Sequence, residues 1–308
     1  MRNSLIKFIT KEAKTNKNLY LLTGDLGFGV FDEFRRDLPD QFVNVGVAEQ
    51  NMTTIACGLA LEKNKVFTYS IGNFSTLRCL EQIRNDICYH NTDVTVITVG
   101  AGFSYGQLGI SHFATEDISI LRSLPNISIF SPCDSWELEN LLEQIKEISG
   151  PKYIRIDKSS ANSKNNGDAI IGTPRLCLGG SDAILYATGG IVGEALEAAQ
   201  ILKKKNISLG VYSIHTLKPI DSDLILNQIK KVENIFTIEE HTVIGGLGSI
   251  IAEIISESNL NIKRFKRFGI NDEFPYVVGD QKYLRKFHKL DAKSISLKIE
   301  NVIRKSRI

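Results

Sequence analysis

The stretch FVNVGVAEQNMTTIACGLALEKNKVFTYSIGNF, residues 42–74, decides the fold class. It begins as a β-branched strand, turns at GVAEQ into a helix rich in small residues, and returns to a strand over 65–74. The same alternation extends in both directions. Further strands are expected at 18–27, 93–102, 127–134 and 152–157, with helices at 75–90 and 135–148. Strands that alternate with helices predict a parallel sheet covered by helices on both faces.

The composition changes at KSSANSKNNGD (158–168), which is polar and has no periodicity. Such a segment is typical of a linker. The alternation then resumes with DAILYATGG (182–190), a helix at 191–206 and NIFTIEEH (234–241). We therefore expect two three-layer α/β/α domains with mainly parallel sheets, residues 1–160 and 180–308, joined by a linker at 161–179.

The bulk composition excludes several classes of protein. With 43% hydrophobic and 23% charged residues and a net charge of +2, the chain resembles an ordinary globular protein without the basic field that nucleic-acid binding needs. An apolar run long enough to span a membrane is absent from the sequence. The five cysteines show no CxxC or zinc-ligand spacing, which favours free thiols in a reducing cytosol. We expect a cytoplasmic protein.

Five residues near the expected carboxyl ends of strands stand out, each with a structural alternative. Glu49 is a carboxylate among small apolar residues, although an acid in the first turn of a helix is also stabilised by the helix dipole. His112 lies in a glycine-rich loop, where it is either solvated or functional. Phe74 is either core or site, and Asp25 is either a turn residue or a ligand. Arg155, near the end of an apolar strand, is either paired structurally or binds an anion.

The chain resembles the C-terminal half of transketolase, and most closely the C-terminal subunit of split, two-gene transketolases. The segments that carry the resemblance are VGVAEQNMTTIACGLAL, FTYSIGNFSTLRCLEQIRNDI, YGQLGISHFATEDISILRSLPNISIFSPCDSWE, PKYIRI and EEHTVIGGLGSI. The motifs in the first half of the chain are specific to this family. Those in the second half occur more widely across the thiamine diphosphate superfamily. The resemblance implies a pyrimidine-binding domain followed by the transketolase C-terminal domain.

The resemblance also implies roles for individual residues. Glu49 is expected to hydrogen-bond the N1′ nitrogen of thiamine diphosphate and Phe74 to stack on its aminopyrimidine ring, so that the protein orients and polarises a cofactor that performs the chemistry. His112 is expected to act on substrate hydroxyls as a catalytic residue. The remaining implied contacts are Asp25, Leu26 and Ile71 for the cofactor, and Arg155, Leu108 and Gln107 for the substrate.

The sequence departs from the family in two respects. The diphosphate-binding motif, GDG followed by NN, is absent, so this chain is expected to provide no metal ligand. The resemblance thus implies an N-terminal partner subunit that holds Mg²⁺ and the diphosphate, in a heterotetramer built around a dimer of this chain. At the position of Leu108 the family has an acidic residue that contacts the sugar. The position of a second family histidine corresponds to the region of Gly100, where this sequence has none. These changes suggest an unusual sugar phosphate or related activated sugar as substrate.

Three alternatives stay open. Two use the same cofactor: the β subunit of a 2-oxoacid dehydrogenase, and an enzyme similar to deoxyxylulose-phosphate synthase. The EQNM and SHFATED stretches favour transketolase over both. The third is a non-catalytic regulatory half, which Leu108 favours and which Glu49, Phe74 and His112 argue against.

Overall fold

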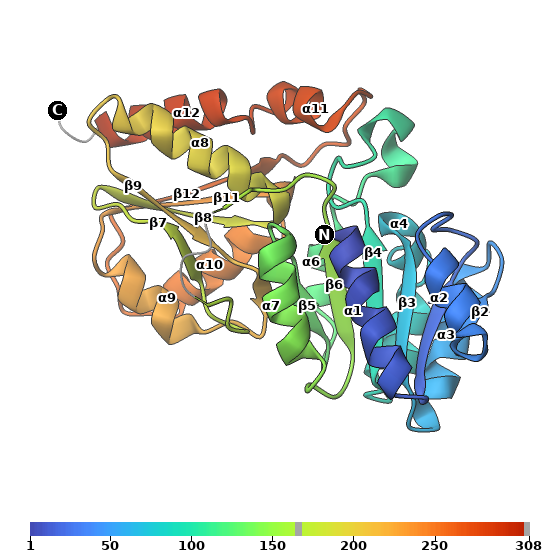
Figure 1. Ribbon diagram of the computed structural model, residues 1–308. Coiled ribbons are helices and arrows are strands. Elements are labelled where there is room, and N and C mark those ends of the chain that lie inside the picture. Colours follow the sequence, from blue (N-terminus) through green and yellow to red (C-terminus); the bar gives the residue numbers. More distant parts are fainter. Residues whose placement is uncertain (164–167, 305–308) are drawn as a thin grey trace.

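The computed structural model describes residues 1–163 and 168–304 and contains two sheets (Figure 1). The first has the order β10-β5-β6-β4-β3-β1-β2, and all of its strands are parallel except β10. Its strands are β1 (Leu19–Thr23), β2 (Phe42–Asn44), β3 (Lys65–Ile71), β4 (Val94–Val99), β5 (Ser128–Phe130), β6 (Lys152–Ile156) and β10 (Thr216–Lys218).

Helices cover both faces of the first sheet because its strands are apolar on both sides. One face packs against α1 (Arg2–Thr15) and α7 (Ser135–Ile145), and their contact residues form one core cluster. The other face packs against α3 (Glu49–Leu61) and α6 (Asp117–Arg122). This second core continues into the other domain, so the two domains share buried apolar surface.

The second sheet has the order β12-β11-β8-β9-β7. Helices α8 (Val192–Lys203) and α12 (Ala292–Arg304) cover one face, and α9 (Ser222–Ile229) and α10 (Leu247–Ser256) cover the other (Figure 1). A short helix, α11 (Gln281–Phe287), lies toward the first domain. The strands are β7 (Arg175–Leu178), β8 (Ala183–Thr188), β9 (Leu209–Ser213), β11 (Asn234–Thr242) and β12 (Arg264–Ile270).

The predicted fold class is confirmed, but two local predictions are wrong. The expected linker at 161–179 contains β7, which pairs antiparallel with β9 and so belongs to the second sheet. The single helix expected at 75–90 is instead α4 (Gly72–Ser75), α5 (Leu80–Gln82) and a π-helix, η2 (Ile83–Cys88). The hydroxyls of Ser75 and Thr76 donate to the backbone carbonyls of Ile71 and Gly72, and such bonds compete with a regular helical ladder.

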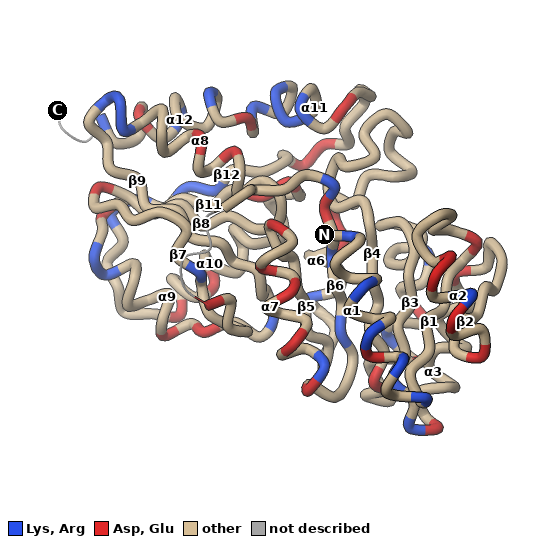
Figure 2. The backbone as a smooth tube through the Cα atoms, in the orientation of Figure 1, with Lys and Arg blue, Asp and Glu red and all other residues tan. Residues whose placement is uncertain are grey.

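Charged residues of both signs occur along both domains, as Figure 2 shows. Within the described residues, none of the helices has the length and apolar character that crossing a membrane would require.

Candidate functional site

The carboxyl ends of β1, β3, β4 and β6 meet at one edge of the first sheet, the edge where parallel sheets place their sites. Glu49 lies there as the first residue of α3, with only 2% of its surface exposed. The turn after β1 packs directly on it: a Cβ atom added at Gly24 would lie 3.3 Å from Glu49 Cγ. The GDLG turn and the GVAEQ helix start, both predicted as site segments, are therefore neighbours.

Glu49 has a partner that the sequence analysis did not identify. Arg78 Nη1 donates to Glu49 Oε2 at 2.7 Å, and the guanidinium carbon of Arg78 lies 4.7 Å from the ring centroid of Phe74. The expectation of purely apolar surroundings for Glu49 is thus wrong. Arg78 lies in the turn between α4 and α5, four residues after Phe74, and no pattern in the sequence pointed to this ion pair.

A run of rings extends from this ion pair along the sheet edge. The rings of Phe74 and His112 are 5.0 Å apart at 68°, and those of His112 and Tyr105 are 6.2 Å apart. Ser111 Oγ lies 2.9 Å from His112 Nδ1. Burial lowers the pKa of His112, so its imidazole is neutral at pH 7 and offers one donor and one acceptor.

At the other end of this run lies a cavity of about 480 Å³ next to Tyr105. The ammonium nitrogen of Lys158 sits 3.5 Å from the Tyr105 ring centroid, a cation–π contact. Burial, with Arg2 nearby, lowers the pKa of Lys158. The polar lining residues are Arg2, Asn3, Ser4, Tyr105, Ser135, Asp157 and Lys158. We call this the Lys158 end, and the group Glu49, Arg78 and Phe74 the Glu49 end.

The other predicted cofactor residues lie around the Glu49 end. Asp25 is exposed in a left-handed conformation, φ 58°, which aspartate tolerates. Its backbone N–H donates to Asn44 Oδ1 at 3.0 Å, and Asn44 Nδ2 donates back to its carboxylate at 3.1 Å. Leu26, in the same turn, and Ile71, at the end of β3, are half-buried.

The structure places the remaining predicted substrate residues in different environments. Gln107 and Leu108 lie on an exposed 3₁₀ turn, η3 (Gly106–Leu108). The last residue of this turn precedes His112 by four positions. Arg155 is fully buried: its Nε donates to Asp117 Oδ2 at 2.8 Å, and its Nη2 donates to the Ala114 carbonyl at 2.8 Å. This arrangement contradicts the prediction that Arg155 binds substrate and supports its structural alternative. Arg2 and Lys158 are the basic side chains that line the cavity beside Tyr105, and neither was predicted as a site residue.

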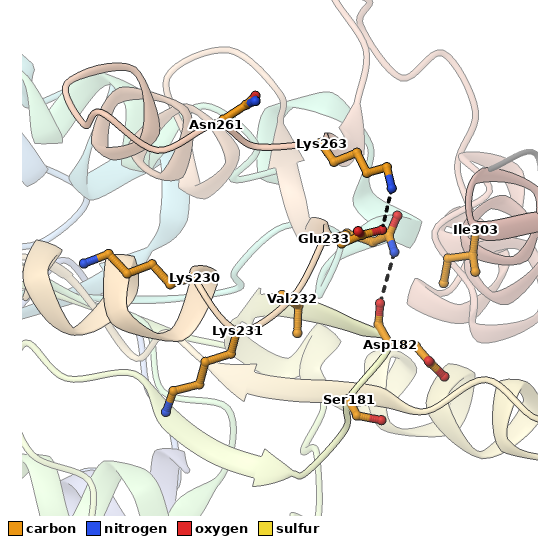
Figure 3. A pocket seen from close by; sticks show the side chains of 10 residues that line it. Ser181, Asp182, Lys230, Lys231, Val232, Glu233, Asn261, Lys263 and Ile303 are labelled. Atoms are coloured by element: carbon orange, nitrogen blue, oxygen red, sulfur yellow. Dashed lines mark hydrogen bonds and ion pairs between the residues drawn. The ribbon is translucent and has the colours of Figure 1, made fainter. Parts of the chain in front are cut away.

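A larger cavity of about 730 Å³ lies elsewhere, where the strands of the second sheet begin (Figure 3). Lys263 Nζ pairs with Glu233 at 2.9 Å across it, and Asn234 donates to the Asp182 carbonyl at 3.0 Å. Lys230 and Lys231 point outward from its rim. Because this is the opposite edge from the carboxyl ends, and because Lys263 is already paired with Glu233, the smaller cavity beside Tyr105 is the better candidate.

Two oxygen atoms, one of Glu49 and one of Asn73 next to Phe74, have no hydrogen-bond donor among the described residues. Glu49 Oε1 accepts no hydrogen bond from the described residues, and Asn73 Oδ1 is buried without a partner among them. A flat ring with N–H donors, stacked on Phe74, would satisfy both the carboxylate and the aromatic face. An aminopyrimidine has this chemistry. Within the same described residues there is no group of three His, Cys, Asp or Glu side chains placed to hold a metal ion.

Comparisons with known proteins agree with this picture. Residues 1–164 match the model of the transketolase pyrimidine-binding domain, and residues 174–295 match that of the transketolase C-terminal domain. A protein of Methanocaldococcus jannaschii described as a transketolase C-terminal section is 36% identical over 310 residues, covering 99% of this chain and 96% of the relative. One of the subunits of an apulose-4-phosphate transketolase from Actinobacillus succinogenes is 36% identical over 264 residues, 85% of each chain.

A solved structure has the same fold over nearly the whole chain. It is a split-gene transketolase, described as an inactive β4 tetramer, with a TM-score of 0.85 and 30% identity. The match covers 98% of this chain and 97% of that one. The chain is therefore similar to separate C-terminal sections and subunits over 85–97% of their length.

Proposed function

The chain belongs to the transketolase family, and we propose that it is the C-terminal subunit of an enzyme that transfers a two-carbon ketol unit between sugar phosphates with thiamine diphosphate. The observation that carries this proposal is the buried carboxylate of Glu49, with one oxygen free, beside the half-buried ring of Phe74 at the carboxyl edge of the sheet. The sequence-based resemblance to split transketolases is confirmed by full-length relatives.

Thiamine diphosphate supplies the carbanion chemistry when bound, and the residues of this chain orient and polarise it. Glu49 Oε1 is proposed to hold the N1′ nitrogen and to exchange a proton with it. Arg78, bound to the other oxygen, fixes the plane of the carboxylate. Phe74 provides the stacking face, which contributes about 0.5–1.5 kcal/mol beyond area burial.

The Lys158 end suits the phosphate of a sugar substrate. Lys158 and Arg2 provide cations at the cavity, and Ser4 and Ser135 provide hydroxyl donors. His112 lies between the two ends and is neutral, so it can hydrogen-bond the hydroxyls of a sugar that extends from one end to the other. Gln107 and Leu108, exposed on the neighbouring turn, are proposed to border the substrate.

The proposal requires a partner subunit. Magnesium needs oxygen ligands in near-octahedral order, and the GDG…NN motif that would hold the metal and the diphosphate is not in this sequence. An N-terminal subunit carrying that motif is proposed to complete the site, with a dimer of this chain in a cytoplasmic heterotetramer. Apolar side chains exposed near the site, including Phe28 (80%) and Val47 (76%), would be covered in such an assembly.

The test is reconstitution with the N-terminal subunit. The chain alone, with thiamine diphosphate and Mg²⁺, is expected to transfer no ketol unit, and activity should appear on titration with the partner and saturate near one to one. A screen of ketose phosphates as donors then defines the substrate, with the Glu49→Gln chain as the inactive control. Consumption of pyruvate instead of a ketose would favour the 2-oxoacid alternatives. Tight, magnesium-dependent cofactor binding by the chain alone would contradict the need for a partner.

A further inference from the structure

Asp157, the residue directly after β6, joins the two loops that form the Lys158 end. Its Oδ1 accepts a hydrogen bond from Ser104 Oγ at 2.9 Å and from the Ser159 backbone N–H at 2.8 Å. Ser104 precedes Tyr105, and Ser159 follows Lys158. The carboxylate is only 5% exposed. Its position therefore fixes where the ring and the ammonium group at the Lys158 end stand relative to each other.

Two side chains of the second domain hold this carboxylate. Gln281 Nε2 donates to Asp157 Oδ1 at 3.0 Å and to Glu240 Oε1 at 2.9 Å. Arg285 pairs with Asp157 Oδ2 at 3.5 Å, and its Nη2 donates to Ser159 Oγ at 2.9 Å. Both lie on α11, which otherwise lines no part of the candidate site.

The backbone of the same loop is also packed against the second domain. The Phe103 N–H donates to Glu240 Oε1 at 2.5 Å, and the Gly279 N–H donates to the Gly106 carbonyl at 3.3 Å. A Cβ atom added at Gly106 would collide with Leu284 of α11, so the helix and the loop are in direct contact. The segment 103–106 that carries Tyr105 is thus held from both sides.

The contact between α11 and the first domain contains more carboxylates than cations, so its hydrogen-bond donors matter. The guanidinium of Arg285 faces three carboxylates, those of Asp157, Glu240 and Glu194. Burial raises the pKa of Glu240, which is opposed by Arg285. Acids outnumber the guanidinium, and the amide group of Gln281, which donates to two of them, adds to the donors that hold Asp157.

We propose that Gln281 and Arg285 of the second domain are positioning residues for sugar-phosphate binding, acting through Asp157 on Tyr105 and Lys158. The second domain thereby gains a task in substrate recognition although it contributes no side chain to the cavity beside Tyr105. This inference rests on the proposed function, because it assumes that the Lys158 end receives the phosphate.

The first test uses Gln281→Met in the enzyme assembled with its N-terminal subunit. This change keeps the side-chain length and removes both donors. The KM for a phosphorylated acceptor aldehyde is expected to rise about tenfold, while kcat and the KM for an unphosphorylated aldehyde change less than about twofold. Equal effects on both aldehydes, or none on either, would overturn the proposal.

A matched control breaks another contact between the domains. Arg122 Nη1 of α6 donates to Glu253 Oε1 of α10 at 2.9 Å, away from the candidate site. Glu253→Gln should lower the melting temperature slightly and leave both KM values unchanged. A KM change in this control as large as that in Gln281→Met would show that any loosening of the domain contact is sufficient, which contradicts positioning through Asp157.

A second measurement does not depend on activity. Inorganic phosphate is expected to raise the melting temperature of the isolated wild-type chain, and to do so less in Gln281→Met, since stabilisation by a ligand follows its affinity. Arg285→Lys, which keeps the charge and loses the planar fork, should fall between the two if it folds. Equal phosphate shifts in wild type and Gln281→Met, or no shift in either, would overturn the inference. An inactive assembled wild type with these shifts intact would instead contradict the proposed transfer reaction.

Discussion

The two ends of the candidate site are built in different ways. At the Glu49 end a carboxylate with 2% exposure is paired with one arginine and lies against a stacking ring. Its three residues come from one stretch of 30, residues 49–78. The Lys158 end is an open cavity whose cations stand 156 positions apart in the chain, at residues 2 and 158.

This difference corresponds to the role that we propose for each end. A buried carboxylate with a fixed partner suits a group that must hold one ring in one orientation and exchange a proton with it. Solvated cations suit a phosphate that enters and leaves, because they bind it without a large desolvation cost. The ends should therefore respond separately to substitution: the Glu49 end in cofactor chemistry, and the Lys158 end in substrate affinity.

Glu49→Gln should have the largest effect. The amide keeps the size of the side chain but cannot exchange a proton with N1′, so the exchange of the thiazolium proton in the assembled enzyme should slow by about 10²–10⁴-fold. Exchange is measured by proton NMR after rapid mixing with deuterium oxide. Because Arg78 is 44% exposed, it can be solvated when its partner is neutral, and the fold should be retained. If the thiazolium proton exchanged at the wild-type rate in this variant, Glu49 would have no part in the cofactor chemistry.

Lys158→Met tests the other end. Loss of a charge-assisted bond to phosphate should raise the KM for a sugar phosphate by about 10–100-fold and leave the exchange of the thiazolium proton unchanged. The comparison of the two ends would break down if this variant slowed proton exchange as Glu49→Gln does. Lys204→Met, an exposed lysine at the end of α8 in the second domain, is a control of the same chemistry.

The sequence predicted most of the fold because the signal is local. Apolar strands of four to eight residues between amphipathic helices are a pattern that needs no knowledge of distant contacts. Three strands were not predicted. β7 and β10 are short and antiparallel, and each becomes a strand only by pairing with a segment far along the chain, β7 with β9 and β10 with β5. β12 is parallel but lies in a basic stretch without an apolar run.

The same distinction explains which residues of the candidate site the sequence could predict. Glu49 and Phe74 stand in motifs whose spacing along the chain is visible, whereas Arg2, Tyr105 and Lys158 come together only through the sheet topology. The sequence left two interpretations of Arg155 open, and only the burial of its guanidinium against Asp117 decides between them. No local pattern shows whether a charged side chain at a strand end points outward or into the domain contact.

Phe74→Ala separates a stacking role from a core role. Phe74 is half-buried, so truncation should lower the free energy of unfolding by less than the roughly 3–5 kcal/mol lost on truncating a fully buried phenylalanine. Cofactor affinity in the assembled enzyme should fall by about two- to tenfold. Melting curves and cofactor titration are run on the same preparations. A large stability loss with unchanged cofactor affinity would show that Phe74 is a core residue. The Glu49 end would then consist only of the ion pair between Glu49 and Arg78.

The smallest expected effect is the coupling between Glu49 and Arg78, which tests whether the Glu49 end is organised before the cofactor binds. Chemical denaturation of wild type, Glu49→Gln, Arg78→Met and the double variant gives a double-mutant cycle. Because the carboxylate is buried but the arginine is partly solvated, the coupling free energy should be about 0.5–2 kcal/mol, above that of most exposed pairs. Arg78 also contacts Phe74, and it does so in the Glu49→Gln background as well. The cation–π contribution therefore cancels in the cycle, which leaves the coupling of Glu49 with Arg78. A coupling indistinguishable from zero would mean that the Glu49 end takes its geometry only when its ligand is present.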